Sequence, residues 1–468
     1  MDQPSPPVSG FRNYRWFIYA LLFFSTNYRW VICALLFFST TCNYLDRQVI
    51  SYLKEFFCRS QGAGGFGWSN TDFANLTSFF TAFYAGVTII AGWVIDKIGT
   101  KLGLALSLIT WSIFGMVNAF VGRLLLMHIL VRSAFAIGEA GNFPASIKTV
   151  AEWFPKRERA LATAVFNSGS NFGAMIAALF VPWCMIHYGD QSGWKMAFIF
   201  TGAIGFLWLI FWFWLYDTPH AQKRLSKAEY DYIHVDDETP GDSQNGDKAG
   251  KVSWWRLFRY RQLWAFFAGK FMTDGVWWFL LFWLPDYLHK QFGMDKSQIM
   301  LPTFVVYGVA IVGSIYGGSI PMTLIKRGMP VYRARMTTMF MIALCPLALL
   351  STQYFGNVEH FGHLASFLAV AMICIGATAH QAWSANLFTT VSDMFPKKAV
   401  GSVTGIGTMA GGIGGVIIQK IAGYLTDAFK QTPQTAYLIM FVICASSYLI
   451  AWSLMKILVP RHKPITDI

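Results

Sequence analysis

The chain has 468 residues, of which 55% are hydrophobic and only 13% are charged. Soluble domains carry about 25% charged residues, so a single soluble core is excluded and an all-α integral membrane protein is predicted. The net charge of +13 would suit nucleic acid, but the Lys and Arg residues stand in short gaps between apolar stretches, as the positive-inside rule describes. We therefore expect the lipid bilayer as a partner and no nucleic acid.

A tandem duplication lies near the N-terminus. Residues 13–26 (NYRWFIYALLFFST) are followed at once by residues 27–40 (NYRWVICALLFFST). The first copy is too short to cross a bilayer alone, which takes about 20 apolar residues, and no small-residue signal-peptide cleavage site follows the apolar run. We expect residues 1–28 to form a cytoplasmic N-terminal segment whose first copy lies at the membrane interface.

Apolar stretches recur along the chain and predict twelve transmembrane helices in two six-helix bundles. The segment between the bundles contains residues 236–247 (DDETPGDSQNGD), a composition that does not form a packed core. The expected parts are an N-terminal bundle at 29–216, a cytoplasmic linker at 217–261, a C-terminal bundle at 262–459 and a cytoplasmic tail at 460–468. The expected spans are 29–50, 72–95, 101–121, 124–148, 159–186, 195–216, 262–288, 299–324, 334–354, 364–392, 400–426 and 434–458.

The distribution of Lys and Arg predicts the orientation of these spans. Both residues gather in the gaps after the second, fourth, eighth and tenth spans. The alternate gaps are poorer in them and richer in glycine, as in 61–67 (QGAGGFG) and 188–193 (YGDQSG). Because positively charged gaps stay in the cytoplasm, the even-numbered gaps and both termini are predicted to be cytoplasmic.

The two halves of the chain repeat short motifs. Residues 153–157 (WFPKR) close the fourth span and residues 394–398 (MFPKK) close the tenth. Each motif precedes a helix rich in small residues, with SGSNFG at 168–173 and glycines at every fourth position across 407–415. Internal repeats of this kind mark transporters whose two bundles rock about a site at the membrane midplane. The glycine series predicts a close approach of another helix.

The gap between the second and third spans carries a family signature. Residues 92–101 (GWVIDKIGTK) resemble the signature loop of the major facilitator superfamily. In that loop a glycine lets two helices touch, and an acid pairs with basic groups at the cytoplasmic gate. The matching gate residues are Gly92, Asp96 and Lys97, whereas the corresponding gap of the second half has no matching acid.

A closer resemblance is to the anion:cation symporter family, which includes bacterial hexuronate, galactonate and glucarate permeases and animal sialin. The resemblance covers nearly everything after residue 27 and is closest to hexuronate transporters. It implies import of a sugar acid by proton symport at the bacterial inner membrane, through alternating access. Organic-anion exchange and uptake of another carboxylate, such as galactonate or glucarate, are the alternatives. The motifs are 43–47 (NYLDR), 138–144 (GEAGNFP), 277–285 (WWFLLFWLP) and 379–386 (AHQAWSAN).

Four ionisable residues lie inside the first and fourth spans, where charged groups are functional candidates by default: Asp46, Arg47, Arg132 and Glu139. An Arg side chain can hold a carboxylate with two parallel hydrogen bonds. A buried carboxyl beside that Arg can take a proton when substrate occupies the Arg. The resemblance implies proton coupling by Asp46 and Glu139, and substrate binding or coupling by Tyr44, Arg47 and Arg132. An ion-pair network that only joins the two spans is the alternative.

Other polar and aromatic residues of the spans are expected to line the cavity. Lys270 is the candidate for a second cationic contact, and pairing with Asp274 one turn away is its alternative. On the tenth span Asn386 is preferred to His380 and Gln381 as a cavity residue. Hydrogen bonding between helices explains such side chains equally well. The further candidates for substrate binding are Tyr84, Asn167, Asn171, Trp278, Trp383 and Asn386.

Motifs for other classes of function are missing from the sequence. No Gly-x4-Gly-Lys-Ser/Thr pattern supports ATP-driven transport, and no nucleophile–base set or metal-ligand cluster has a spacing that suits an enzyme. The seven scattered cysteines predict neither disulfides nor a metal site. We therefore expect a monomeric transporter for a small organic anion and protons, with no enzymatic activity, cofactor or metal.

Overall fold

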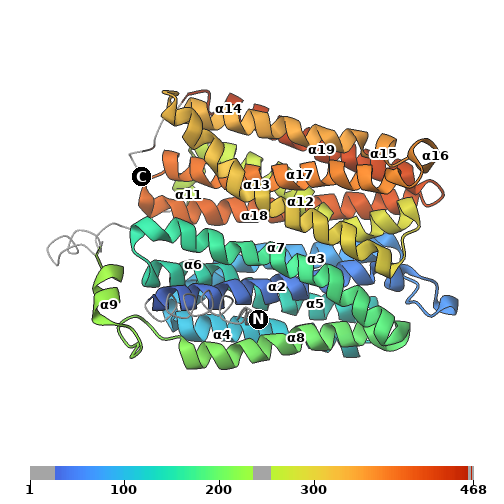
Figure 1. Cartoon of the computed structure of the whole chain (residues 1–468), viewed down its shortest axis with the longest axis horizontal. Coiled ribbons are helices and arrows are strands. Elements are labelled where there is room, and N and C mark those ends of the chain that lie inside the picture. Colours follow the sequence, from blue (N-terminus) through green and yellow to red (C-terminus); the bar gives the residue numbers. More distant parts are fainter. Residues whose placement is uncertain (1–26, 236–253, 462–464, 466–468) are drawn as a thin grey trace, which may run out of the picture.

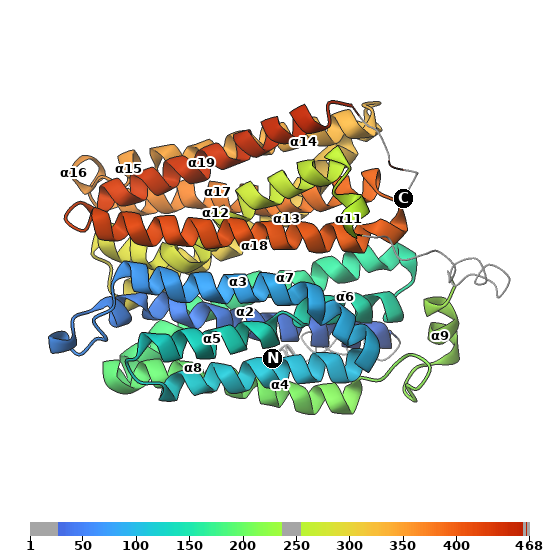
Figure 2. The same ribbon diagram turned by 180° about the vertical axis from the view of Figure 1, so that it is seen from behind.

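The computed structural model describes residues 27–235, 254–461 and 465. The first copy of the duplication and residues 236–253 of the linker therefore lie outside the described residues. Within them the regular structure is entirely helical, and the long helices run side by side along one direction (Figure 1). Seen from behind, the helices keep this common direction (Figure 2).

The first half of the chain forms one group of helices, which we call the N-terminal group and which is drawn in blue to green in Figure 1. The short α9 (Lys227–Ile233) follows this group. Its long helices are α2 (Tyr28–Cys58), α3 (Asn70–Ile98), α4 (Thr100–Val117), α5 (Leu125–Glu139), α6 (Asn142–Trp153), α7 (Lys156–His187) and α8 (Gly189–Leu215).

The second half forms the C-terminal group, drawn in yellow to red. It begins after the short α11 (Trp254–Leu257). The helices of the C-terminal group are α12 (Arg261–Phe292), α13 (Lys296–Lys326), α14 (Val331–Leu344), η3 (Cys345–Ser351), α15 (Thr352–Phe355), α16 (Val358–Phe361), α17 (Leu364–Met394), α18 (Lys397–Ala428) and α19 (Pro433–Leu458). The expected spans coincide with helices of the two groups, with ends that differ by up to eight residues, except that 124–148 covers both α5 and α6, and 334–354 covers α14, η3 and part of α15.

The outer faces of these helices suit a lipid environment. Nine helical segments among the described residues are long and apolar enough to cross a membrane. Large apolar side chains such as Ile210, Ile315, Phe367 and Ile457 are exposed on the surface, which soluble monomers seldom allow over wide areas. The helices α2, α5, α6 and α12 are outside this set. Among the charged residues of α2 and α12 are Arg47, Lys270 and Asp274, which belong to the site described below.

The fourth expected span, 124–148, is not one continuous helix. α5 ends at Glu139 and α6 begins at Asn142. Pro144 has no N–H to donate to the carbonyl of Ala140, and a proline ring disfavours the helical conformation of the preceding turn. The break places Glu139 at a helix end inside the protein, where it is buried.

Glycines let one helix pair pack closely in each group. A side chain added at Gly169 or Gly173 of α7 would collide with the backbone of α2. A side chain at Gly414 of α18 would collide in the same way with the backbone of α12. The two small-residue helices that the repeats predicted therefore hold equivalent places in the two groups.

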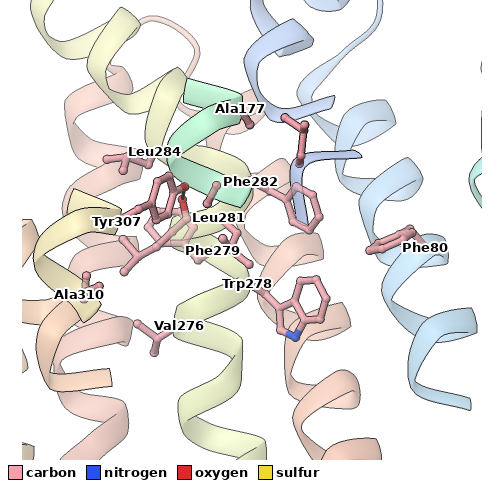
Figure 3. Close-up of a cluster of buried hydrophobic side chains, with 14 of the residues drawn as sticks. Phe80, Ala177, Val276, Trp278, Phe279, Leu281, Phe282, Leu284, Tyr307 and Ala310 are labelled. Atoms are coloured by element: carbon pink, nitrogen blue, oxygen red, sulfur yellow. Dashed lines mark hydrogen bonds between the residues drawn. The ribbon is translucent and has the colours of Figure 1, made fainter. Parts of the chain in front are cut away.

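The two groups meet along three helix pairs, α2 with α12, α3 with α18, and α7 with α13. Apolar side chains fill this contact (Figure 3). Phe80 of α3 lies with its ring centre 6.2 Å from those of both Trp278 and Phe282 of α12. Ala177 of α7 and Tyr307 of α13 belong to the same buried cluster. The core is thus continuous across the two groups.

The contact between the groups is closed toward one end and open toward the other. At Gly412 and Gly423 of α18, an added Cβ would lie 2.2 and 2.4 Å from the side chains of Ala85 and Ala74 of α3. An added Cβ at Gly405 would meet no described atom within 4 Å. The open end is the one that carries the Lys- and Arg-rich gaps, because α18 begins there at its N-terminus.

Candidate substrate-binding site

A cavity of about 180 Å³ lies between the N-terminal and C-terminal groups. Helices α2, α3, α6 and α7 form one wall, and α12, α17 and α18 form the other. Its charged lining residues are Arg47, Lys270 and Asp274. The polar and aromatic lining includes Thr40, Asn43, Tyr44, Tyr84, Asn142, Asn167, Ser170, Trp277, Trp278, His380, Gln381, Ser384 and Thr408.

Arg47 lines this cavity and contacts side chains of both walls. Its Nε donates a hydrogen bond to Oε2 of Glu139 at 3.1 Å, and both side chains are almost completely buried. The guanidinium carbon lies 4.4, 4.5 and 5.3 Å from the ring centres of Tyr44, Tyr84 and Trp278. Such contacts stabilise a desolvated cation. Since Trp278 belongs to the C-terminal group, one guanidinium touches both groups.

Asp46 and Arg132 are buried behind Arg47, outside the cavity lining. The Nη2 of Arg132 donates to the backbone carbonyl of Arg47 at 3.3 Å, and its guanidinium lies over the rings of Phe80 and Phe135. Within the described part of the chain, neither carboxylate oxygen of Asp46 has a hydrogen-bond partner. Buried polar groups without partners are costly, and they concentrate at functional sites.

A second ion pair faces the cavity from the C-terminal group. Lys270 and Asp274 lie one turn apart on α12, with Nζ and Oδ2 separated by 2.5 Å. The ammonium group also lies 4.7 Å from the ring centre of Phe388. The carboxylate of Asp274 packs against Gly411, where a Cβ would stand only 2.2 Å from Oδ2. The pairing that the sequence left open is therefore present, and both partners line the cavity.

The structure brings together six of the ten residues predicted to bind substrate. Two of these residues are on α2, one on α3, one on α7 and two on α12. These lining residues are Tyr44, Arg47, Tyr84, Asn167, Lys270 and Trp278.

The other four predicted contacts lie outside the lining. Asn386 uses its side-chain amide to bind the backbone carbonyls of Gly317 and Ala382, at 2.7 and 2.9 Å. Trp383 is fully buried, and its ring packs edge-on against a tyrosine of α19. Asn171 and Arg132 are buried within the N-terminal group.

The structure adds lining residues that the sequence did not select. They include Asp274 on α12, and His380, Gln381 and Ser384 on α17. His380, Ser384 and Phe388 recur at every fourth position of one helix face, and Gln381, three residues before Ser384, borders that face. This periodicity was the available signal. Asn386 lies on a different face of the same helix.

The predicted gate residues make contacts inside the N-terminal group. Asp96 pairs with Lys148 of α6 at 2.9 Å. A Cβ added at Gly92 would lie 3.9 Å from the side chain of Pro144 on α6. Lys97 instead places its ammonium group 3.9 Å from the ring centre of Trp93. In this conformation the signature loop therefore joins α3 to α6.

Polar side chains join the two groups at the closed end. Lys54 of α2 is completely buried and binds Asp286 of α12 at 2.6 Å. Asp427 of α18 accepts hydrogen bonds from the backbone N–H groups of Asn70 and Thr71 at 3.0 and 2.7 Å. These and the similar contacts of this end are called the bridging contacts. They are Lys54–Asp286, Asn70–Asp427, Thr71–Asp427, Asn70–Lys290, Asn75–Lys420 and Asp190–Lys296.

A profile of the Major Facilitator Superfamily matches residues 36–419. The chain therefore belongs to this superfamily of membrane transporters. It is a multi-pass membrane transporter, not an enzyme.

Three bacterial transporters are similar to the chain in sequence. The hexuronate transporter of Escherichia coli K12 is 28% identical over 400 residues, which cover 86% of this chain and 88% of that protein. The D-galactonate transporter of Escherichia coli O6:H1 is 27% identical, with 82% and 87% covered. The probable galactarate/D-glucarate transporter of Escherichia coli K12 is also 27% identical, with 82% and 85% covered.

The fold is also found among solved structures. A bacterial homologue of the human lysosomal transporter Spinster, in an inward-facing and unoccupied conformation, matches with a TM-score of 0.69. The match covers 92% of this chain and 98% of that chain, at 19% identity. At this identity the likeness shows a shared fold alone.

Proposed function

We propose that this transporter imports a sugar acid of the hexuronate type together with protons, by alternating access. The observation that carries the proposal is the buried Arg47–Glu139 ion pair in a cavity shared by both helix groups. The names of the three similar bacterial transporters, all of sugar acids, support the same substrate class.

Arg47 is the proposed anchor for the substrate carboxylate. A guanidinium offers two parallel N–H donors, a geometry that matches a carboxylate better than a single ammonium charge does. Tyr44, Tyr84 and Asn167 also line the cavity, and their hydroxyl and amide groups are proposed as partners for sugar hydroxyls. The Trp278 ring supplies an apolar surface on which the C–H face of a sugar ring can stack.

The same ion pair suggests how proton uptake follows substrate binding. When the cavity is empty, Glu139 compensates the charge of Arg47. A substrate carboxylate that takes over Arg47 leaves Glu139 buried without its cation, and an isolated buried charge is strongly unfavourable. A proton on Glu139 removes that charge. Asp46, buried behind Arg47, is proposed as a second proton carrier.

Alternating access is supported by the one-sided opening between the groups. The cavity lies at their junction, and the groups separate toward the end with the Lys- and Arg-rich gaps. The positive-inside rule places that end in the cytoplasm. We therefore propose an inward-facing conformation, cytoplasmic termini and, from the bacterial relatives, the inner membrane as the location.

Uptake of labelled glucuronate into proteoliposomes tests this function. An inward proton gradient should drive accumulation above equilibrium, and a protonophore should abolish it. Arg47→Lys should lower uptake at subsaturating glucuronate by about tenfold or more, whereas Arg461→Lys, a matched change at an exposed position, should leave uptake unchanged. Uptake that does not depend on the proton gradient would indicate exchange or facilitated diffusion instead of symport. Absence of uptake by folded protein, for glucuronate and other sugar acids alike, would overturn the proposal.

A further inference from the structure

We infer that the C-terminal wall of the cavity selects sugar acids with one carboxylate against those with two, and that Asp274 sets this preference. The inference rests on the proposed function, because it concerns the specificity of the same cavity. It is not indicated by the similar transporters, whose names include acids of both kinds.

The charges that line the cavity favour a single negative charge on the substrate. Arg47 and Lys270 supply two positive charges, and Asp274 supplies one negative charge. With Glu139 protonated, as proposed above for the substrate-bound state, these three lining residues give the cavity a net formal charge of plus one. A monoanion balances this charge, whereas a dianion leaves one negative charge uncompensated at membrane depth, where unpaired charges are unfavourable.

The positive charges are also separated along the cavity. Arg47 touches Trp278, while Asp274 and Lys270 lie one and two turns before Trp278 on the same helix. At a rise of 1.5 Å per residue, the Cα atoms of Lys270 and Trp278 are about 12 Å apart along the axis of α12. A substrate whose carboxylate binds Arg47 therefore directs its other end toward the Lys270–Asp274 pair.

This pair suits hydroxyl groups and disfavours a second carboxylate. The ammonium group of Lys270 is a donor and the carboxylate of Asp274 is an acceptor, held 2.5 Å apart. A sugar hydroxyl both donates and accepts, so it can bind the two at once. A carboxylate only accepts, so it would gain Lys270 while facing the like charge of Asp274 at close range.

Packing holds Asp274 in place against the substrate. Its carboxylate is in contact with Gly411 of α18, and Lys270 lies against the ring of Phe388. Neutral hydrogen-bonding groups, Gln381 and Ser384, complete this part of the lining. The C-terminal wall thus offers donors and acceptors without net charge, and the N-terminal wall offers the carboxylate anchor.

The inference is tested by measuring how well unlabelled six-carbon sugar acids inhibit uptake of labelled glucuronate. The acids differ in the group at one end of the molecule. Unlabelled galacturonate and galactonate carry one carboxylate, and galactarate and glucarate carry two. In the wild-type protein the monocarboxylates should compete at concentrations at least about tenfold lower, since juxtaposed like charges strongly disfavour binding. In Asp274→Asn, which keeps the shape and frees the charge of Lys270, this ratio should fall by about tenfold or more.

Three further variants separate charge from shape. Asp274→Glu keeps the negative charge and should keep the preference. Lys270→Gln leaves Asp274 as an unpaired carboxylate and should discriminate more strongly against the dicarboxylates. Asp231→Asn, an exposed position on α9, should leave the ratio unchanged. Size-exclusion chromatography in detergent shows which variants are folded.

Two results would overturn the inference alone: equal or better competition by dicarboxylates in the wild type, or a ratio that Asp274→Asn leaves unaltered. Should Asp274→Asn fail to fold, the wild-type ratio and the direction of change in Lys270→Gln decide the question. A folded wild-type protein that takes up no sugar acid would overturn the proposed function, and the inference with it.

Discussion

At the scale of single residues, each of the two cations that line the cavity has a carboxylate partner in its own helix group. Arg47 is held by Glu139, and Lys270 is held by Asp274. A buried ion pair contributes little net stability compared with apolar packing, but removing one partner is strongly destabilising. Under the proposed function, a substrate that binds at such a pair would replace one partner, and the consequences would depend on which charge loses its partner.

Glu139→Gln should separate binding from coupling. The amide keeps the size of the side chain and stays neutral, so Arg47 remains available to substrate. We expect binding and exchange of glucuronate to persist while accumulation driven by a proton gradient is lost. Counterflow and gradient-driven uptake measured on the same proteoliposomes check this. Concentrative uptake by the variant would show that Glu139 does not carry the coupled proton.

Arg47→Lys should weaken binding even though the positive charge is kept. An ammonium group cannot form two parallel hydrogen bonds with one carboxylate, and it stacks less well on Tyr44 and Tyr84. We expect the apparent affinity for glucuronate to fall by about tenfold or more. Ligand-induced thermal stabilisation measures the change. Wild-type affinity in the variant would remove Arg47 as the carboxylate anchor.

Charged residues of the membrane spans can be selected from the sequence more readily than the uncharged residues that line the cavity. Asp46, Arg47, Arg132 and Glu139 are recognisable because charges inside apolar spans are rare. Asn386 and the side chains of α17 that line the cavity share one helix, and hydropathy does not reveal which face of a membrane helix points inward. Both lipid and the protein core accept apolar residues, so the rotational phase of α17 depends on packing that the sequence does not display.

At the scale of elements, the helix pairs α2–α7 and α12–α18 are closed by glycines. Gly173 accommodates α2 beside Tyr44, and Gly411 accommodates Asp274. The glycines therefore position cavity residues as well as helices. The repeats of small residues predicted the close packing of these helices, and the hydropathy pattern predicted the helices themselves.

The sequence did not predict how α9 docks. Glu229 of α9 accepts hydrogen bonds from the backbone N–H groups of Tyr28 and Arg29, and these partners are too distant in sequence to give a local signal.

Alanine at two glycines of α18 should have opposite effects on stability. At Gly414 the new methyl group would lie 2.0 Å from the carbonyl oxygen of Phe271, so the thermal unfolding temperature should fall. At Gly401, apart from the adjoining part of α18 itself, no described atom lies within 4 Å of the new methyl group. There the higher helix propensity of alanine should stabilise by about 0.5–1 kcal/mol. Thermal unfolding of the two detergent-purified variants measures both changes in stability. A Gly414→Ala protein as stable as the wild type would contradict the packing described.

At the scale of the whole molecule, the two groups are joined by apolar packing in the middle and by the bridging contacts at one end. The expected spans located the helices but not this asymmetry. Lys54 and Asp286 are 232 positions apart, and Lys54 lies beyond the expected end of its span. Pairings of this kind depend on the tertiary arrangement, and no periodicity in the sequence predicts them.

Asp286→Asn should open the closed end. The change leaves the buried ammonium group of Lys54 without its counter-charge, which destabilises that contact by about 3–5 kcal/mol. Spin labels at Gln61 and Lys430, two exposed positions at this end, should show longer and broader distances. The double variant Lys54→Met with Asp286→Leu restores an uncharged contact and should recover the shorter distances. Unchanged distances in Asp286→Asn would mean that other bridging contacts hold the end closed.

The one-sided bridging contacts also have a kinetic consequence. Separating the groups at the closed end requires several hydrogen bonds and ion pairs to break together, with water replacing each partner, whereas the opposite end is already apart. The two halves of a transport cycle therefore face unequal activation barriers. The step in which the bridging contacts break should limit turnover. The turnover rate should therefore depend on temperature, and on mutations at the closed end, far more steeply than substrate affinity does.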